Sequence, residues 1–422
     1  MISSNKIQKS AKTINNHMFL LFMIVIFLFI FIPNSVTYKN YIITAMGLLS
    51  FFFTLLDNKN NKRIFILPII LSVTFLLSFF ITRNASIQEI LWILIYFTIS
   101  LTFIDNKKLL LDIKILLYIV LGSFLFLSVF NFNPNTVFYG TSRNIVSAIS
   151  LFVLAIYLLI CYNFNKPFSK IPILIFAIAC YWAIGRTGVI LAVMTLIIFV
   201  FVDNKNYSFK FDYKFLIFSI IIVIVLINQI SIINNFEKLT SSVSMKLTSG
   251  ESNQIKEQKL LNSPIKNITD ITIDNDAVTN FEGRAMGSPR FEMWIGYYNS
   301  CLHSFKSFFW GVERANHPDV YLYGENLHNA FFILHSKTGI LGFLTIGLLL
   351  LNSFIYMIKN KKYFPIIILI LIGIRSMMDW VGFFGYYDII YYYFIIEFSD
   401  YNKYTKKIKS RLLSKEKQSI GN

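Results

Sequence analysis

Charged residues are scarce in this chain of 422 residues. Only 14% are Asp, Glu, Lys or Arg, whereas charged side chains make up about 25% of ordinary soluble domains. Hydrophobic residues reach 55%, and the mean hydropathy is +0.60. A single water-facing domain cannot hide that much apolar surface. This composition excludes an ordinary soluble enzyme and predicts a protein whose solvent is lipid.

Residues that bind metals or form disulfides are also few. Of the three cysteines, Cys161 and Cys180 lie in apolar runs, and Cys301 is alone in the long hydrophilic stretch, so no disulfide is expected there. The five histidines show no spacing with cysteine or carboxylate that is typical of a zinc site. A glycine-rich phosphate loop is lacking as well. We therefore expect neither a metal ion nor a bound cofactor.

Apolar runs long enough to cross a bilayer, which takes about 20 residues, recur along nearly the whole sequence. They predict an all-α polytopic membrane protein with about twelve transmembrane helices. The runs are centred on residues 18–36, 41–56, 64–82, 87–104, 113–130, 145–162, 171–185, 187–202, 215–234, 336–357, 364–376 and 380–398. The first run follows lysines, as in a signal peptide, but has no small-x-small cleavage pattern, so we interpret it as a span.

Acidic residues are the rarer charge, 22 against 39 Lys and Arg, and the formal net charge is +17. Lysine clusters fall at every second connection between the apolar runs and in the C-terminal tail. This alternation follows the positive-inside rule and predicts that both termini lie in the cytoplasm. The basic charge then faces anionic lipid, so the sequence indicates a membrane partner rather than nucleic acid.

This assignment of spans to the two sides of the membrane divides the chain into four segments. Residues 1–234 form a transmembrane bundle of about nine spans, and residues 235–328 form an external loop. Residues 329–398 add about three spans, and residues 399–422 form a basic cytoplasmic tail. The external loop holds eleven acidic and nine basic residues. The excess of positive charge therefore lies in the rest of the chain.

Arginine is much rarer than lysine, nine residues against thirty, and is distributed differently. Only Arg63 and Arg411 fall on the predicted cytoplasmic side. Membrane insertion in the predicted orientation needs only positive charge, which lysine supplies. Arginine outside the cytoplasmic side therefore indicates a use for its planar guanidinium group, which binds phosphate or carboxylate with two hydrogen bonds. The alternative is that an individual arginine caps a helix or pairs with a loop acid. The arginines on or near the predicted external face are Arg83, Arg143, Arg186, Arg284, Arg290, Arg314 and Arg375.

The turn Gly185-Arg186-Thr187-Gly188 interrupts two apolar runs at the predicted outer boundary. A charge at this depth is costly without a partner. The flanking glycines permit a tight turn or a close backbone approach, which would let a ligand headgroup reach the guanidinium. The alternative is a hairpin turn with a snorkelling arginine. Arg143 lies in a similar polar entry to the sixth span.

From Arg290 onward the external loop becomes aromatic. Apolar residues recur at three- and four-residue steps, among them Phe291, Trp294, Tyr298 and Phe305. This spacing predicts an amphipathic helix lying on the membrane surface, with Arg290 at its start and Trp294 one turn further on. The alternative is a lid with no binding role.

Polar residues then run directly into the tenth span, within residues 323–335. If a helix begins near Asn326, the amides of its first turn and His328 face the external water and form a site disposed to hold an anion. Glu325 and Asn329 lie in the same polar segment. The alternative is that a histidine at a helix end has a structural role.

His335 lies seven residues beyond His328, about two helical turns, so both imidazoles can occupy one face. Gly339 and Gly342 follow within the same span. We expect these glycines to allow a helix break or close helix packing.

At these residues the sequence resembles the bacterial family of O-antigen polymerases and O-antigen ligases, which are polytopic enzymes that process lipid-linked saccharides outside the membrane. The resemblance covers roughly residues 140–375, and the first four spans are similar to the family in hydropathy alone. The Arg186 turn resembles the family's Ser-Arg-x-Gly turn, with Gly185 in place of the serine. Arg290 with Trp294 resembles a loop arginine followed by an aromatic residue. His328-Asn329, followed by Gly339 and Gly342, resembles the family's His-Asn segment with two later glycines.

The resemblance implies glycosyl transfer from undecaprenyl-diphosphate-linked oligosaccharide at the external face of the bacterial inner membrane, with inversion and without a metal ion or nucleotide sugar. It implies that Arg186 and Arg290 stabilise the leaving diphosphate and that His328 is the general base. A chain-length regulator and a flippase are the protein partners it implies. The substrate-binding residues that it suggests are Arg284, Arg143, Asn329, Glu325, His335, Trp294 and Arg314, and Glu325 alternatively orients His328.

Several functions share these features. A polymerase transfers the saccharide to a lipid-linked repeat unit, whereas a ligase transfers it to the lipid A core. The strong bias toward Ile, Asn, Lys and Phe is typical of polysaccharide gene clusters and favours the polymerase. A transporter, including a flippase for lipid-linked oligosaccharide, is the alternative from another class, because about twelve spans suit many carriers. A structural or sensory membrane protein is a further alternative.

Overall fold

The computed structural model describes most of the apolar part of the chain. It covers residues 36–57, 65–84, 87–104, 109–130, 144–183, 185–221, 289–313, 327–378 and 382–398, with a few single positions before residue 138. The chain divides into two compact units, one of residues 1–216 with 290–422 and one of residues 217–289. The helices named below belong to the first unit, apart from Pro289 at the start of α12.

Helices make up most of the described residues, and none of these residues lies in a β-strand, which agrees with the all-α prediction. The helices are α2 (Val36–Asp57), α3 (Ile66–Thr82), α4 (Ile87–Ile104), α5 (Leu109–Val129), α7 (Asn144–Asn163), α8 (Ile171–Trp182), α9 (Arg186–Val200), α12 (Pro289–His303), α13 (Phe305–Trp310), α14 (Ala330–Lys359), α15 (Tyr363–Met377) and α16 (Asp388–Phe398).

Two described helices, α7 and α14, are long and apolar enough to cross a bilayer, and six shorter apolar helical stretches of 10 to 17 residues accompany them. Most of the predicted spans at residues 18–36 and 215–234 falls outside the described residues. The prediction of about twelve spans therefore stays a prediction.

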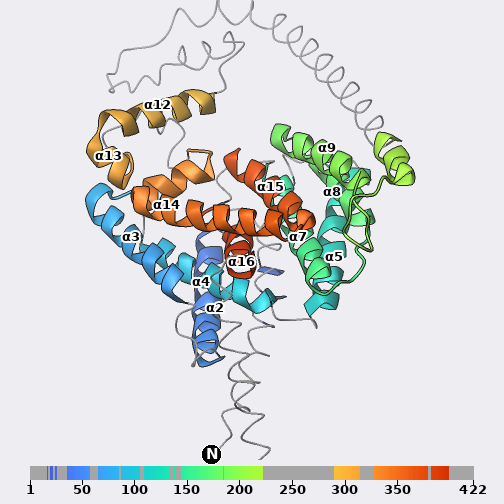
Figure 1. Cartoon of the computed structure of the whole chain (residues 1–422), viewed down its shortest axis with the longest axis horizontal. Helices are drawn as coiled ribbons and strands as arrows, with labels where there is room; N and C mark the ends of the chain where they lie inside the picture. The colour runs from blue at the N-terminus through green and yellow to red at the C-terminus, as the bar shows by residue number, and fades with distance from the viewer. Residues whose placement is uncertain are drawn as a thin grey trace, which may run out of the picture. The chain divides into compact units, whose positions relative to one another are not determined.

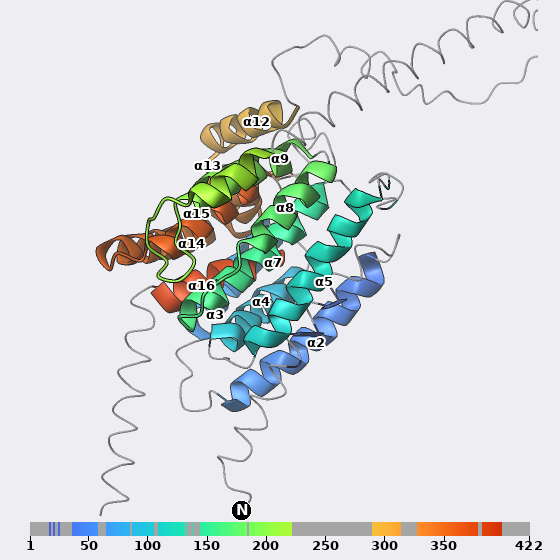
Figure 2. The ribbon, with the colours of Figure 1, turned by 90° about the vertical axis from the view of Figure 1, so that its right-hand side faces the viewer.

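The helices pack in two sets that α15 joins (Figure 1). The first set is α5, α7, α8 and α9, and Figure 2 shows α5, α8 and α7 side by side. The second set is α2, α3, α4, α14 and α16, in which α14 packs most extensively against α3. Helix α15 contacts α7 and α9 in the first set and α14 in the second. Helix α7 is a core helix, since nearly all its side chains are buried.

Several helices are apolar on the outward face as well as the inward one. On α3, Leu67, Leu71 and Phe75 are buried, and the opposite face exposes Ile69, Val73 and other large apolar side chains. Helix α14 repeats this pattern with an exposed row of Leu341, Leu344, Leu348, Leu351, Ile355 and Ile358. These helices are hydrophobic all round, rather than amphipathic with a polar outer face.

Two predicted helix starts were wrong. Helix α14 begins at Ala330, and neither at Asn326 nor at residue 336. Helix α16 begins at Asp388 rather than at residue 380, because the chain turns between residues 382 and 387 with Phe383 and Phe384 in the left-handed region. In both places a polar side chain sets the boundary, and hydropathy does not detect it.

Helix α14 breaks at Gly339, where φ is 65° and ψ is −172°. A Cβ atom there would lie 2.1 Å from the carbonyl oxygen of Phe309. At Gly342 a Cβ atom would lie 3.1 Å from the hydroxyl of Thr74 on α3. The two glycines therefore provide the break and the close packing expected of them.

We predict that Gly339→Ala destabilises the fold by about 2–3 kcal/mol or more, because the new Cβ meets both a left-handed backbone and a fixed carbonyl. The matched control is Gly347→Ala in the same helix, where an added Cβ meets nothing within 4 Å. That variant should leave stability unchanged or raise it by up to about 1 kcal/mol. Unfolding in mixed micelles of a denaturing detergent measures both. Equal effects of the two variants would contradict this account of the break.

In the first helix set, an ion pair between Lys170 and Asp212 holds the connection that follows α9. Lys170 Nζ lies 2.9 Å from Asp212 Oδ2 and 2.9 Å from the carbonyl oxygen of Phe199. Burial acts to raise the pKa of Asp212, but hydrogen bonds from Lys170 and from the amides of Phe215 and Lys214 together hold this pKa below its usual value. The charged form of Asp212 is therefore stabilised in the folded chain.

We predict that Asp212→Asn lowers stability at pH 7 and lowers it less at pH 3. Since the pKa is depressed on folding, the stabilising contribution is complete above about pH 4, the pKa of a free Asp, and disappears as the pH falls through the folded-state pKa. The difference should be at most about 1 kcal/mol, because the carboxylate is partly exposed. Unfolding midpoints of the two proteins at both pH values measure it. A difference that grows toward pH 3 would show that the charge of Asp212 is not the cause.

Candidate active site

A buried histidine on α14 bonds to both α12 and α13. Helix α13 also packs against α14 (Figure 1). The hydroxyl of Tyr297 lies 2.8 Å from His335 Nδ1, and His335 Nε2 lies 2.8 Å from the carbonyl oxygen of Phe308. A carbonyl only accepts, so Nε2 carries the proton and Nδ1 accepts from Tyr297. His335 thus joins three helices. Its predicted contact with substrate would require one of these hydrogen bonds to break, so the geometry favours a positioning role.

The aromatic row of α12 that is predicted to lie on the membrane surface is not the face that packs against the protein. Met293 and Tyr297 are fully or almost fully buried, whereas Phe291 and Tyr298 are exposed. Tyr297 faces inward because it is hydrogen-bonded to His335 on α14. Phe291 and Tyr298 therefore lie on the outward face of α12. An exposed apolar row remains on α12, formed by Phe291, Ile295, Tyr298 and Leu302.

Trp294 and Arg290 lie one turn apart on α12. Each donates a hydrogen bond to a backbone carbonyl in a segment far away in the sequence. Trp294 Nε1 donates to the carbonyl oxygen of Leu327 at 2.8 Å, and its ring meets that of Phe332 edge-on. Arg290 Nη1 donates to the carbonyl oxygen of Met378, just after α15, at 3.0 Å. One turn of helix therefore connects the residue before His328 with the end of α15.

His328 has a backbone that few residues adopt. Its φ is 48°, in the left-handed region, where a residue other than glycine is uncommon. It lies immediately before Asn329, which caps α14, and its side chain is half-buried. Unusual backbone geometry of this kind persists where the surroundings impose it and is concentrated at functional sites.

Asn329 changes the anion site that the sequence suggested. Its Oδ1 accepts hydrogen bonds from the amides of Phe331 and Phe332 at 3.0 and 3.2 Å. Two amides of the first helical turn are thus already satisfied by the cap. The expectation that His328 lies inside the first turn, with free amides facing water, was therefore wrong, because His328 precedes the helix.

A fully buried arginine that the motif analysis did not select lies one turn before Met378. Arg375 Nη2 donates to the carbonyl oxygen of Asn144 at 2.9 Å, where α7 begins. A Cβ atom at Gly185 would lie 2.6 Å from Asn144 Oδ1, and one at Gly188 would lie 2.7 Å from Ser147 Cβ. The Arg186 turn therefore packs directly on the start of α7, beside the end of α15.

The start of α14 also lies close to the end of α15. A Cβ atom at Gly382 would lie 2.6 Å from Ser376 Oγ and 3.1 Å from Ala330 Cβ, so Gly382 is wedged between α15 and α14. The segments that carry Arg290, His328, Arg375 and the Gly185 turn are thus linked by direct contacts, although they lie far apart in the sequence.

Not every predicted residue can be placed. Arg143, Arg284, Arg314 and Glu325 lie outside the described residues, and for Arg186 the structure describes the backbone, which begins α9, but not the side chain. Their predicted roles remain predictions.

A cluster of ionisable side chains that no sequence motif selected lies beside this site. Lys337 on α14 forms an ion pair with Glu89 in the first turn of α4, and its ammonium lies 5.5 Å from the ring centre of Phe384. Asp388 is buried, and its Oδ2 accepts from the amide of Phe384 at 2.7 Å. No regular spacing links Glu89, Lys337 and Asp388, so only the packing of α4, α14 and α16 brings them together.

Among the described residues, no three His, Cys, Asp or Glu side chains form a group that could ligate a metal ion. Burial raises the pKa of the Cys301 thiol on α12 to about 11, although a hydrogen bond with Tyr297 acts in the opposite direction. Cys301 is therefore a thiol, not a reactive thiolate, at neutral pH. In comparisons with known proteins, no family model, curated protein or solved structure matches this chain.

Proposed function

We propose that this chain is a multi-pass membrane glycosyltransferase that joins oligosaccharide repeat units carried on undecaprenyl diphosphate, as an O-antigen or capsular polysaccharide polymerase does. The observation that carries the proposal is the linked arrangement of Arg290, His328 and the Gly185 turn through α12, α15 and the start of α7. These are the three segments on which the family resemblance rests. The reaction is placed at the external face of the inner membrane, with both termini in the cytoplasm.

The outward faces of the helices support a lipid environment. Soluble proteins rarely expose contiguous apolar patches above a few hundred Å², yet α3 and α14 expose large aliphatic side chains along their length. In a bilayer these faces contact acyl chains, while the helical backbone satisfies its own hydrogen bonds. Helices α8 and α16, of 12 and 11 residues, are shorter than the hydrocarbon core is thick, so they span through local thinning of the bilayer.

The contacts between helix ends support the proposed threading. Alternation places the end of α3, the start of α7, the start of α14 and the end of α15 outside. Asn84, just after α3, donates to the carbonyl oxygen of Val312 at 2.6 Å, and Arg375 reaches Asn144. On the opposite side, Tyr393 near the end of α16 donates to Asn163 at the end of α7 at 2.6 Å. Each contact joins ends that the threading assigns to one side.

Two arginines can offset the charge of the leaving diphosphate. A guanidinium has five N–H donors, so the bond from Arg290 to Met378 orients the group without exhausting it. Arg186 stands at the N-terminus of α9, where the helix dipole adds positive potential. Fixed positive charge in a partly desolvated site stabilises a transition state in which the diphosphate oxygen gains negative charge.

His328 supplies the base. The acceptor hydroxyl gives its proton to the imidazole, the acceptor oxygen bonds to the anomeric carbon, and the bond from that carbon to the diphosphate oxygen breaks, with inversion. The strained backbone of His328 and the cap at Asn329 fix the position of the imidazole. A ligase would use the same step with the lipid A core as acceptor.

A second candidate function is transport of a lipid-linked oligosaccharide. The ion pair of Lys337 with the buried Glu89, and the buried Asp388, favour it, because ionisable groups inside a membrane domain mark ion or substrate pathways. We prefer the polymerase because the diphosphate that leaves in its reaction also explains why arginines lie on the external side.

The proposal is tested by deleting the gene in its native host and examining surface polysaccharide on a gel. Collapse of a long ladder to core with one repeat unit supports polymerisation. Loss of all repeat units from the core, with lipid-linked polymer accumulating, would make the protein a ligase. An unchanged ladder would contradict both enzymatic readings and favour transport of another substrate.

A further inference from the structure

The connection that follows α9 is a hydrogen-bonded hairpin of residues 201–213. Val202 and Phe209 form an antiparallel bridge, and the amide of Lys210 donates to the carbonyl oxygen of Phe201 at 2.8 Å. The amide of Asp203 donates to the carbonyl oxygen of Ser208, also at 2.8 Å. The hairpin lies at the end of α9 remote from the Gly185 turn, so it takes no part in the candidate active site.

One side of the hairpin is anchored to the protein. The Tyr207 hydroxyl donates to the carbonyl oxygen of Lys166, and its ring packs edge-on against Phe364 at 4.8 Å between centroids. The ion pair of Asp212 with Lys170 closes the base of the hairpin. These contacts give the hairpin a fixed position against α8 and α15.

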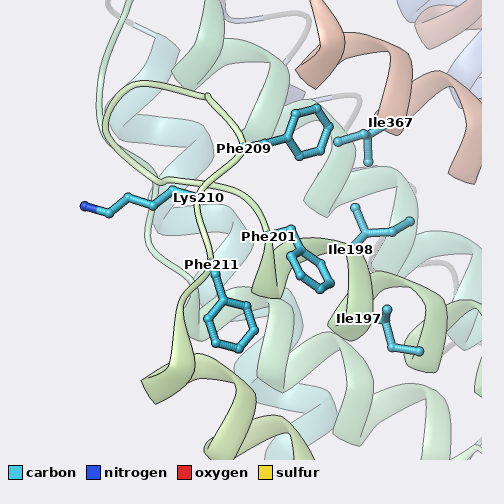
Figure 3. Close-up of a pocket in the computed structure, with 7 residues that line it drawn as sticks. All are labelled: Ile197, Ile198, Phe201, Phe209, Lys210, Phe211 and Ile367. Atoms are coloured by element: carbon cyan, nitrogen blue, oxygen red, sulfur yellow. The ribbon is translucent and has the colours of Figure 1, made fainter.

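The other side presents aromatic rings to the surroundings. Phe201, Phe209 and Phe211 are 45%, 62% and 54% exposed. Together with Ile197 and Ile198 on α9 and Ile367 on α15, they line a groove of about 440 Å³ (Figure 3). Apart from Lys210, every lining residue is hydrophobic. A rigid support that exposes an apolar groove indicates a binding surface rather than a loosely packed loop.

Lys210 gives the groove a charged rim. In Figure 3 the ring of Phe209 points toward Ile367, whereas the side chain of Lys210 extends the opposite way, with its ammonium beyond the rings. No carboxylate among the described residues forms an ion pair with Lys210. Lys205 lies in the same exposed hairpin. The site therefore combines an apolar channel with cations at one edge.

We propose that this groove holds an acyl chain of an anionic phospholipid of the cytoplasmic leaflet, whose phosphate contacts Lys210. The groove continues the lipid-facing side of α9, where Ile190 and Val193 are also exposed, so its occupant arrives from within the bilayer. An ammonium at the edge of the hydrocarbon selects a negative headgroup. The inference rests on the membrane location in the proposed function but not on glycosyl transfer.

The chain offers a matched pair of variants for a test. Ile197 lines the groove and Ile190 lies two turns earlier on the same helix, and both are 57% exposed. Ile197→Trp fills the groove, while Ile190→Trp adds the same ring elsewhere on α9. Lys210→Glu reverses the charge at the rim, and Lys359→Glu reverses an exposed lysine at the end of α14.

The measurement is native mass spectrometry of the full chain purified in detergent and titrated with phosphatidylglycerol or with phosphatidylcholine of the same acyl chains. The wild type should retain phosphatidylglycerol preferentially, and Ile197→Trp should bind it about tenfold more weakly. Lys210→Glu should abolish the preference for the anionic lipid, and the two control variants should behave as the wild type. Equal binding of both lipids by the wild type, or equal losses in Ile190→Trp and Ile197→Trp, would overturn the proposal. Recovery of the chain in the soluble fraction would instead refute the membrane location on which both proposals depend.

Discussion

His328→Ala is expected to lower polymer synthesis by about 10²- to 10⁴-fold, the usual contribution of a positioned general base. Without the imidazole, the acceptor hydroxyl must attack while still protonated or give its proton to water. The expected loss is measured as the rate of ladder formation in membranes that contain equal amounts of the two proteins. Long polymer should disappear, and lipid-linked single repeat units should accumulate.

The backbone of His328 requires its own control, because alanine is disfavoured in the left-handed region. Asparagine adopts that region readily, so His328→Asn should fold and insert as the wild type does while remaining as inactive as His328→Ala. His303→Ala, which removes an exposed histidine at the end of α12, should keep full activity. If His328→Asn retains wild-type activity, His328 has a structural role and another group is the base.

Arg375→Ala is expected to cost about 3–5 kcal/mol of stability. Its side chain is fully buried and donates to the carbonyl oxygen of Asn144. Truncation leaves a cavity between α15 and α7 and a buried carbonyl that has lost a donor. Unfolding in mixed micelles of a denaturing detergent measures the loss. Met377→Ala, at a neighbouring position that is half-exposed, should change stability by no more than about 0.5 kcal/mol.

Arg375→Met separates packing from hydrogen bonding. It keeps most of the volume and removes the donors, so it should cost about 1–3 kcal/mol. Since Arg375 holds the end of α15, whose next turn accepts from Arg290, we also expect polymer synthesis to fall in the fraction of Arg375→Met that stays folded. Full activity together with unchanged stability in Arg375→Met would show that the buried guanidinium is not the link between the two helix sets.

The positions of most helices follow from hydropathy alone. Continuous apolar runs predict α3, α4, α7 and α9 to within about two residues of their observed ends, because a long run leaves few ways to bury it. Boundaries set by one polar side chain are different. The start of α14 depends on the cap at Asn329, and the turn before α16 depends on Asp388 and two left-handed phenylalanines.

The candidate site was predictable in part. Short motifs identified Arg290, Trp294 and His328, and the structure gives the two α12 residues direct partners at Met378 and Leu327. Arg375 carried no signal beyond its charge near a helix end, since its importance comes from complete burial against α7. Likewise, Tyr297 became significant only when the packing of α12 placed it on His335. Long-range partners of this kind have no spacing in sequence from which to infer them.

Transfer of a saccharide between undecaprenyl-diphosphate carriers is the activity that we propose for this chain. Its most direct test supplies the purified protein, in bilayers, with lipid-linked single repeat units from the native host, in the presence of EDTA, and follows the products by mass spectrometry. We expect carriers that bear two or more repeat units, one released undecaprenyl diphosphate for each glycosidic bond formed, and neither product with His328→Asn. Recovery of unchanged single repeat units, with the wild type folded and inserted, would contradict the claim.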